Sequence, residues 1–220
     1  MEIHHISAEH LSIGLVREIL DRHITLALSD DAKRRIVRCR EYLDRKMEHP
    51  ERPIYGITTG FGSLCNISVG HDDLAQLQKN LMMSHACGTG ERVPSEIVRL
   101  MLLLKVQSLS YGHSGVQLAT VERLIDFFNA DILPVVYQQG SLGASGDLAP
   151  LAHMSLPLIG LGEVEYEGRV RPAAEVLAEK GWAPIELQSK EGLALLNGTQ
   201  FMSAYGAVSY THLRAHETKA

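Results

Sequence analysis

The 220-residue sequence is poor in cysteine and has no long apolar run. Its three cysteines, Cys39, Cys65 and Cys87, lie far apart and form no Cys-x-x-Cys pair, which indicates neither a disulfide framework nor a zinc site. No segment approaches the roughly 18 apolar residues of a membrane-spanning helix, and the first residues, "MEIHHISAEH", lack the basic and apolar regions of a secretory signal. We therefore predict a cytoplasmic protein without a metal or a membrane partner.

The sequence also has no excess of positive charge. Its formal net charge is -5, and acidic and basic residues are interspersed, so no global field attracts nucleic acid. The densest basic run, Lys33 to Arg40, is flanked by acidic residues and follows a helical pattern, which is typical of a solvated helix face. Since 45% of the residues are hydrophobic, the chain can bury the core of one or two globular domains.

Apolar residues recur mainly at helical spacing, which predicts a mainly α fold. The strands that the pattern supports form one small β-hairpin around "EVEYEGRVR", with a turn at Glu167-Gly168. Most of the glycine falls in long loops, of which 55–66 and 140–154 are the richest. The expected helices run from Ser29 to Pro50, from Asp72 to Gly88, from Pro94 to Ser110, from Leu118 to Phe128 and from Pro172 to Gly181, and one more is capped by Ser189.

The loop "GSLGASGDLAPLAHM" precedes an apolar helical run and contains Ala144, Ser145 and Gly146, three small residues that admit two interpretations. In the first, Asp147 or Ser145 caps the helix and Pro150 occupies its first turn. In the second, the Gly146 nitrogen closes onto the Ala144 carbonyl, and loss of water leaves a dehydroalanine-type electrophile. Glycine suits this closure because a side chain would obstruct it. The tripeptide alone is too common to decide between the two.

Other glycine-rich patterns match known sites incompletely. "GFGSLC" lacks the third glycine of a dinucleotide fingerprint, and "GITTGFG" lacks the Gly-Lys ending of a phosphate-binding loop. "GHSGV" and "GASGD" each miss the last glycine of a nucleophile elbow, and no strand is expected before them. These patterns disfavour a nucleotide-binding protein and leave a serine hydrolase as a weak alternative.

Four segments together resemble the histidine and aromatic amino acid ammonia-lyase family. They are "YGITTGFGSL" from Tyr55, "NLMMSHACGTGE" from Asn80, "GSLGASGDLAPLAHMSLPLIGLGE" from Gly140 and "KEGLALLNGTQ" from Lys190. Their order and spacing match the N-terminal half of the family, up to about Ala207. The resemblance implies that residues 1–207 form the active-site-loop and prosthetic-group region of a helical, ammonia-lyase-like fold. Residues 208–220 are unlike the family, so we expect an irregular tail that is not native to it.

The resemblance also implies a prosthetic group and a catalytic tyrosine. In this family the Ala-Ser-Gly triad cyclises into 4-methylidene-imidazole-5-one (MIO), which Ala144, Ser145 and Gly146 would form here. The former Ser145 side chain would then be the carbon that accepts the amine of the substrate, with no metal required. Tyr55 matches the catalytic tyrosine of the glycine-rich loop, although a tyrosine there could instead anchor the loop by packing its ring.

Two further residues match positions that bind the substrate in the family. Asn197 matches the asparagine near the prosthetic group, and its plainer interpretation is a helix C-cap. His85, in a Ser84-His85 pair, resembles the histidine-specific members, whereas a lone histidine at a helix end often interacts with the helix dipole. The implied activity is elimination of ammonia from L-histidine to give trans-urocanate. An aminomutase, an aromatic amino acid ammonia-lyase and a non-catalytic fragment are the alternatives, and His113 and His153 are interpreted as structural.

Members of the family continue well beyond this sequence, and their active sites combine several subunits of a homotetramer. We therefore expect the chain alone to be inactive. The segment from Pro94 to Ser110 is apolar on nearly every face, so we also expect the missing part to cover it. Without that part, a large apolar patch should be exposed.

Overall fold

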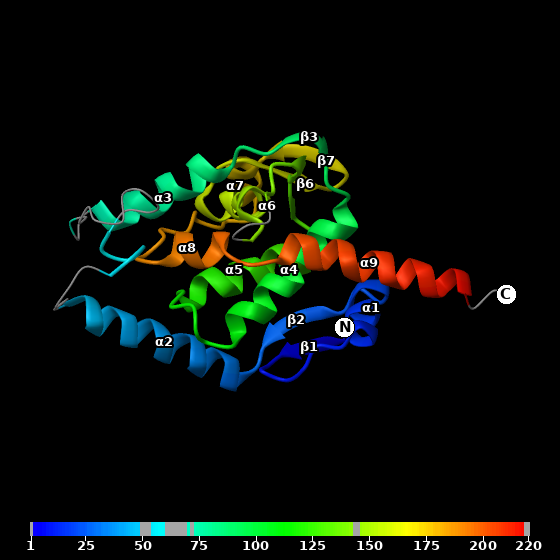
Figure 1. Ribbon diagram of the computed structural model, residues 1–220, viewed down its shortest axis with the longest axis horizontal. Coiled ribbons are helices and arrows are strands. Elements are labelled where there is room, and N and C mark those ends of the chain that lie inside the picture. The colour runs from blue at the N-terminus through cyan, green and yellow to red at the C-terminus, as the bar shows by residue number, and fades with distance from the viewer. Residues whose placement is uncertain (1, 49–53, 60–69, 71–72, 143–145, 218–220) are drawn as a thin grey trace.

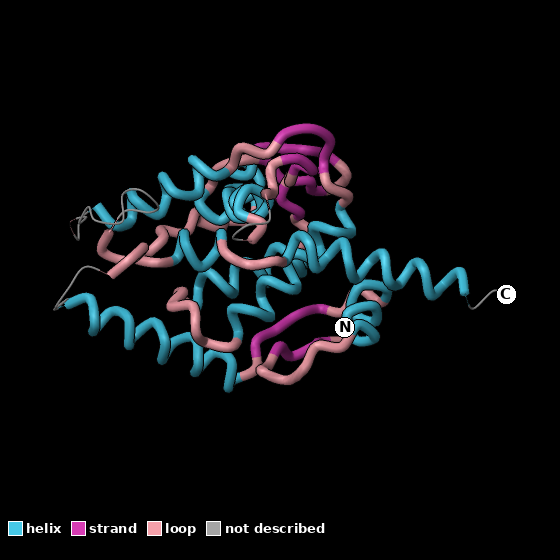
Figure 2. The backbone as a smooth tube through the Cα atoms, viewed as in Figure 1, coloured by secondary structure: helices cyan, strands magenta, loops and turns pink. Residues whose placement is uncertain are grey.

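The computed structural model describes residues 2–48, 54–59, 70, 73–142 and 146–217, with side chains up to residue 210. Helices dominate, as predicted, and the short strands form two groups on opposite sides of the central helices (Figure 1; Figure 2). Within the described residues, no helix is both long and apolar enough to cross a membrane. In chain order the elements are β1 (Ile3–Ile6), α1 (Ile13–Asp21), β2 (Thr25–Leu28), α2 (Asp30–Glu48), α3 (Leu74–His85), β3 (Thr89–Arg92), α4 (Ser95–Ser110), α5 (Leu118–Asn129), β4 (Leu133–Pro134), β5 (Tyr137–Gln139), α6 (Leu148–Ser155), the 3₁₀ helix η3 (Leu156–Ile159), β6 (Glu163–Tyr166), β7 (Arg169–Pro172), α7 (Ala173–Glu179), α8 (Glu191–Leu196) and α9 (Gln200–Glu217).

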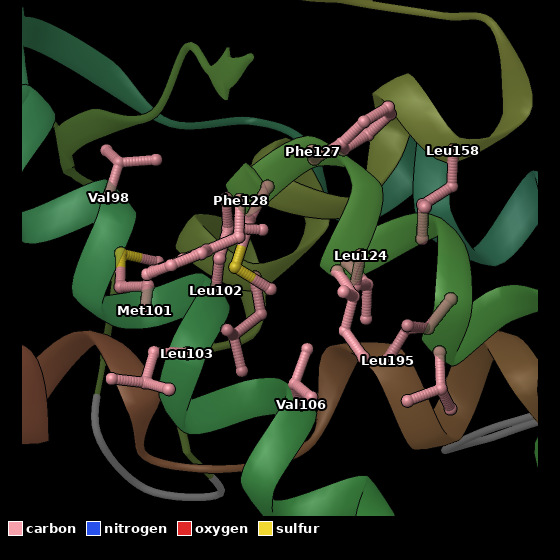
Figure 3. Close-up of a cluster of buried hydrophobic side chains, with 14 of the residues drawn as sticks. Val98, Met101, Leu102, Leu103, Val106, Leu124, Phe127, Phe128, Leu158 and Leu195 are labelled. Carbon is pink, nitrogen blue, oxygen red and sulfur yellow. The ribbon is translucent and has the colours of Figure 1, made fainter. Parts of the chain in front are cut away.

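Helix α4 is the centre of the core. It is buried on nearly every face, and α5, α9 and α2 pack against it. The expectation of a large exposed apolar patch on this helix is wrong, because other segments of the same chain cover it. Figure 3 shows part of this cluster, including Val98, Met101, Leu102, Leu103 and Val106 of α4 with Leu124, Phe127 and Phe128 of α5.

The N-terminal strands pack on the end of α5. Strands β1 and β2 pair in parallel and are connected through α1. The side chain of Asn129 accepts a hydrogen bond from Leu26 N at 2.8 Å and donates one to Leu26 O at 2.9 Å. This amide therefore satisfies backbone groups of β2 that a neighbouring strand would otherwise pair. The predicted start of α2 is confirmed, since Ser29 Oγ accepts the Ala32 N–H at 3.2 Å.

The predicted hairpin is confirmed as β6 and β7, which pair in antiparallel register. Glu167 and Gly168 connect them with φ angles of 52° and 70°, as a type I′ turn requires. Strand β4 extends this hairpin to three strands, and β3 pairs with β5. These additional strands and the pair β1 and β2 were not predicted, because runs of two to four residues carry no clear alternation.

Two local predictions near the C-terminus are wrong. Ser189 does not cap α8, because Lys190 occupies the N-cap position with φ 71° and Ser189 binds the guanidinium of Arg40 through its carbonyl and its hydroxyl. The backbone from 208 to 217 is not irregular, because α9 continues to Glu217. The foreign origin of residues 208–220 stays a prediction.

Candidate active site

The segment that follows the predicted triad lies directly against the loop between α8 and α9. Asp147 N donates to Gly198 O at 2.9 Å, and Gly146 has a φ of +103°. A Cβ atom on Gly146 would lie 2.5 Å from Gly198 O, so both the backbone conformation and the space require glycine here. Ala144 and Ser145 lie outside the described residues.

Asp147 connects this segment to the start of α9. Its carboxylate accepts the Met202 N–H at 3.0 Å and the Ser141 hydroxyl at 3.1 Å. Met202 is the third residue of α9, where the N–H has no partner within the helix. Asp147 is also the N-cap residue of α6, which is one of the two predicted caps, but its side chain makes no capping bond to that helix. Pro150 lies in the first turn of α6, as predicted.

Asn197 lies at the C-cap of α8 and is exposed. Its side-chain Nδ2 donates to Leu193 O at 2.9 Å, which fits the plainer of its two interpretations. Its backbone carbonyl accepts from the ammonium of Lys105 at 2.9 Å. Because the next residue is Gly198, the backbone around Asn197 forms one wall of the space that Gly146 occupies.

His85 is the last residue of α3, and its ring is half-buried. Its Nδ1 lies 2.9 Å from Leu81 O and 3.2 Å from Ser84 Oγ. A carbonyl oxygen can only accept, so Nδ1 carries the proton in the neutral ring and Nε2 is the acceptor. The contact with Leu81 O is the helix-end interaction that the sequence allowed. It also fixes the ring in one tautomer.

A half-buried histidine, His153, links the segment after α3 to α6. His153 Nε2 accepts the Gly88 N–H at 2.9 Å. The rings of His153 and Tyr137 pack edge to face, with their centroids 5.1 Å apart. Burial lowers the pKa of His153, which favours the neutral ring that this acceptor role needs. The helix that follows the triad is thereby fixed to the segment that follows His85.

Tyr55 is 55% exposed in the turn at 54–59. The small apolar cluster beneath this turn contains Ile57, packed with Leu43, Met47 and Leu74. Ile57 is thus the residue of this turn that packs in the cluster, and both interpretations of Tyr55, as a loop anchor and as a catalytic residue, stay predictions.

Three residues that organise this region were not predicted in these roles. The contact of Asp147 with α9 was not expected, His153 was interpreted as structural without a specific contact, and Lys105 was not singled out. A signal for Lys105 was present, because it is a charged residue in the middle of a helix that is apolar on nearly every face. In the described part of the chain, no cluster of three His, Cys, Asp or Glu side chains could hold a metal ion.

Known proteins are similar to this chain in sequence and in fold. Histidine ammonia-lyase of Deinococcus radiodurans is 58% identical over 182 residues, which are 83% of the chain and 34% of that protein. The structure of histidine ammonia-lyase from Trypanosoma cruzi matches 94% of the chain and 39% of its own length with a TM-score of 0.84 and 37% identity. Tyrosine aminomutase from Streptomyces globisporus matches 94% of the chain and 38% of its own length with a TM-score of 0.87 and 36% identity.

The chain thus spans between 34% and 39% of the length of these proteins. A family model described as aromatic amino acid lyase matches residues 11–218, which include the glycine-rich loop, the triad and the loop between α8 and α9. Since this match covers nearly the whole sequence, the chain belongs to the aromatic amino acid lyase family.

Proposed function

We propose that the chain is the N-terminal part of a lyase that eliminates ammonia from L-histidine to give trans-urocanate. The observation that carries the proposal is the close approach of Gly146 to Gly198, at the end of an Ala-Ser-Gly triad in a chain 58% identical to a histidine ammonia-lyase. The chain is much shorter than these relatives, so we expect it to be inactive alone. Like the family, the whole protein is expected to be a cytoplasmic homotetramer.

The described residues fit a ring formed from Ala144, Ser145 and Gly146. Ring closure needs the Gly146 nitrogen to approach a carbonyl two residues earlier, and the positive φ and the missing Cβ of Gly146 suit such a turn. The residue after the triad, Asp147, is fixed by the hydrogen bond from its N–H to Gly198 O. The MIO group supplies an electrophilic carbon for the amine of the substrate.

The other site residues would bind the substrate and move its protons. His85 presents Nε2 as a hydrogen-bond acceptor, because Leu81 O fixes the proton on Nδ1. This acceptor suits an N–H of a substrate imidazole, which a phenyl ring lacks. The hydroxyl of Tyr55 would assist proton transfer beside the amine, and the side-chain amide of Asn197, an exposed residue, would bind near the ring.

An aminomutase is the second candidate, and the similarity to the Streptomyces globisporus enzyme supports it. The higher identity to a histidine ammonia-lyase favours the lyase. The two candidates differ in their products, because an aminomutase returns the amine to the β-carbon. Detection of a β-amino acid in place of urocanate would identify the aminomutase.

The experiment has two parts. Intact-mass and peptide analysis of the purified chain should show loss of two waters from the peptide that contains residues 144–146, and Ser145→Ala should abolish this loss. For activity, residues 1–207 are joined to the remaining part of the Deinococcus radiodurans relative, and urocanate formation is followed by absorbance. The proposal predicts turnover of L-histidine by the chimaera and none by the 220-residue chain.

The matched variant is His85→Leu in the same chimaera. Removal of the acceptor should raise KM for histidine by about tenfold or more, while the mass of the triad peptide stays that of the cyclised form. Unchanged histidine kinetics would contradict the role of His85, and an unmodified triad in folded protein would contradict the proposed function.

A further inference from the structure

Lys105 is a buried cation that the proposed reaction does not use. It lies in the middle of α4 and is 1% exposed. Its Nζ donates to Ala194 O at 3.1 Å and to Asn197 O at 2.9 Å. No carboxylate forms an ion pair with it in the part of the chain that the structure describes. Burial lowers its pKa from 10.5 to about 7.

A side chain with this desolvation cost needs a compensating role, because a methionine of similar length would fill the same space. The carbonyls at the end of a helix have no partner within the helix, and α8 is only six residues long. An ammonium has three donors and can satisfy two such carbonyls at once. Lys105 therefore fixes the end of α8 from the side of the core.

The contacts continue from Lys105 to the triad. Asn197, whose carbonyl Lys105 binds, is followed by Gly198. Gly198 O accepts the Asp147 N–H and lies 2.5 Å from where a Cβ of Gly146 would be. Lys105 thus binds the carbonyl of Asn197, and the next residue, Gly198, contacts Gly146 and Asp147.

We propose that Lys105 is a positioning residue that holds the Asn197-Gly198 backbone in the place required by Gly146 for ring closure. This inference rests on the proposed function for its link to ring formation. The fixing of the loop by itself does not depend on any reaction. Lys105 contacts neither the reacting atoms nor the substrate, and it acts through the backbone of Asn197.

The first test uses the chain with Ser145→Ala, in which no ring can form. Amide hydrogen exchange is measured in the peptide that covers residues 193–199. Lys105→Met should accelerate exchange there by about tenfold to a hundredfold, because two hydrogen bonds to a charged donor are lost. Peptides from α5 should keep their protection, since methionine fills the core. Arg99→Met is the matched control, a cation on the same helix that pairs with Asp131 instead.

Lys105→Arg keeps a positive charge and N–H donors but changes the shape of the side chain. It therefore separates the contribution of hydrogen bonding from that of packing. It should retain most of the protection that Lys105→Met loses. The proposal is overturned if Lys105→Met exchanges like the parent chain, or if the arginine and methionine variants exchange equally fast.

The second test restores Ser145 and follows ring formation by mass. Lys105→Met should slow the loss of two waters by about tenfold relative to the unsubstituted chain and to Arg99→Met. An equal rate would overturn the link between Lys105 and ring formation. If the unsubstituted chain forms no ring, the proposed function fails, and the exchange experiment still decides the role of Lys105.

Discussion

Replacing Asp147 with alanine tests the connection between the segment after the triad and the start of α9. The residue is 4% exposed, and its carboxylate accepts from Met202 N at 3.0 Å and from Ser141 Oγ at 3.1 Å. A hydrogen bond to a charged group contributes about 1.5–3 kcal/mol, and loss of a helix N-cap costs about 0.5–2 kcal/mol. The Met202 bond is itself the cap of α9, so these two ranges describe one contact.

The second contact adds less, because Ser141 is only partly buried and its hydroxyl can turn to water. We therefore expect Asp147→Ala to lower the free energy of unfolding by about 2–3 kcal/mol. Asp147→Asn keeps one oxygen that can accept the Met202 N–H, so it should cost about half as much. Both values are measured by urea unfolding followed by far-UV circular dichroism, with the slope checked for constancy.

Asp21→Ala is the control for removing a carboxylate. Asp21 pairs with Arg17 on the surface of α1, and both side chains are more than half exposed, at 63% and 56%. An ion pair of this kind contributes roughly 0–1 kcal/mol. If Asp147→Ala destabilised the chain no more than Asp21→Ala, the reasoning that Asp147 caps α9 would be refuted.

Three further predictions concern neighbouring residues. The pKa of Lys105 is about 7 in the folded chain and 10.5 when unfolded, so unfolding takes up a proton between these pH values. The free energy of unfolding should therefore rise with pH above about 7. Lys105→Met should remove this rise in urea titrations. The pKa of His153 is lowered by burial, so its contribution should be lost as pH falls through and below about 6.5, and His153→Phe should flatten this acid limb in the same assay. Gly146→Ala should lower the free energy of unfolding by about 1–3 kcal/mol, because Gly146 has a φ of +103° and Gly198 O lies close to it. Gly181→Ala should cost less, because the space around Gly181 is open. Thermal unfolding of both variants measures this difference.

The long helices could be predicted from the sequence because their signals are local. Ser29 and the acidic residues after it predict the start of α2, and the apolar run from Pro94 predicts α4. The signal for the hairpin at 163–172 is also local, because it is the Glu167-Gly168 pair, and both residues adopt the left-handed φ angles of its turn. The strands of two to four residues depend on pairing partners far along the chain, which periodicity does not encode.

Long-range contacts also explain the errors within the candidate site. Asp147 has the sequence context of a cap for α6, yet its carboxylate binds a backbone N–H 55 residues later. The all-round apolar pattern of α4 correctly indicated burial, but it could not tell whether the cover came from this chain or from another segment. Lys105 has donors that reach across the core to residues 89 and 92 positions away. Each of these partners is specified by the fold and not by its neighbours in sequence.

The same reasoning explains why Gly146 and Gly198, which lie 52 residues apart in the sequence, are both glycine. Gly146 and Gly198 have φ angles of +103° and +140°, which side chains rarely adopt, and their backbones touch each other. Gly146 also needs the space, because Gly198 O lies 2.5 Å from where its Cβ would be. For Gly198 the nearest obstacle is the end of the Gln200 side chain, which can move, so its backbone conformation is the stronger constraint. Each loop thus needs its glycine for a contact that exists only when α6, α8 and α9 have packed together, so ring closure by Gly146 would depend on prior folding of this region.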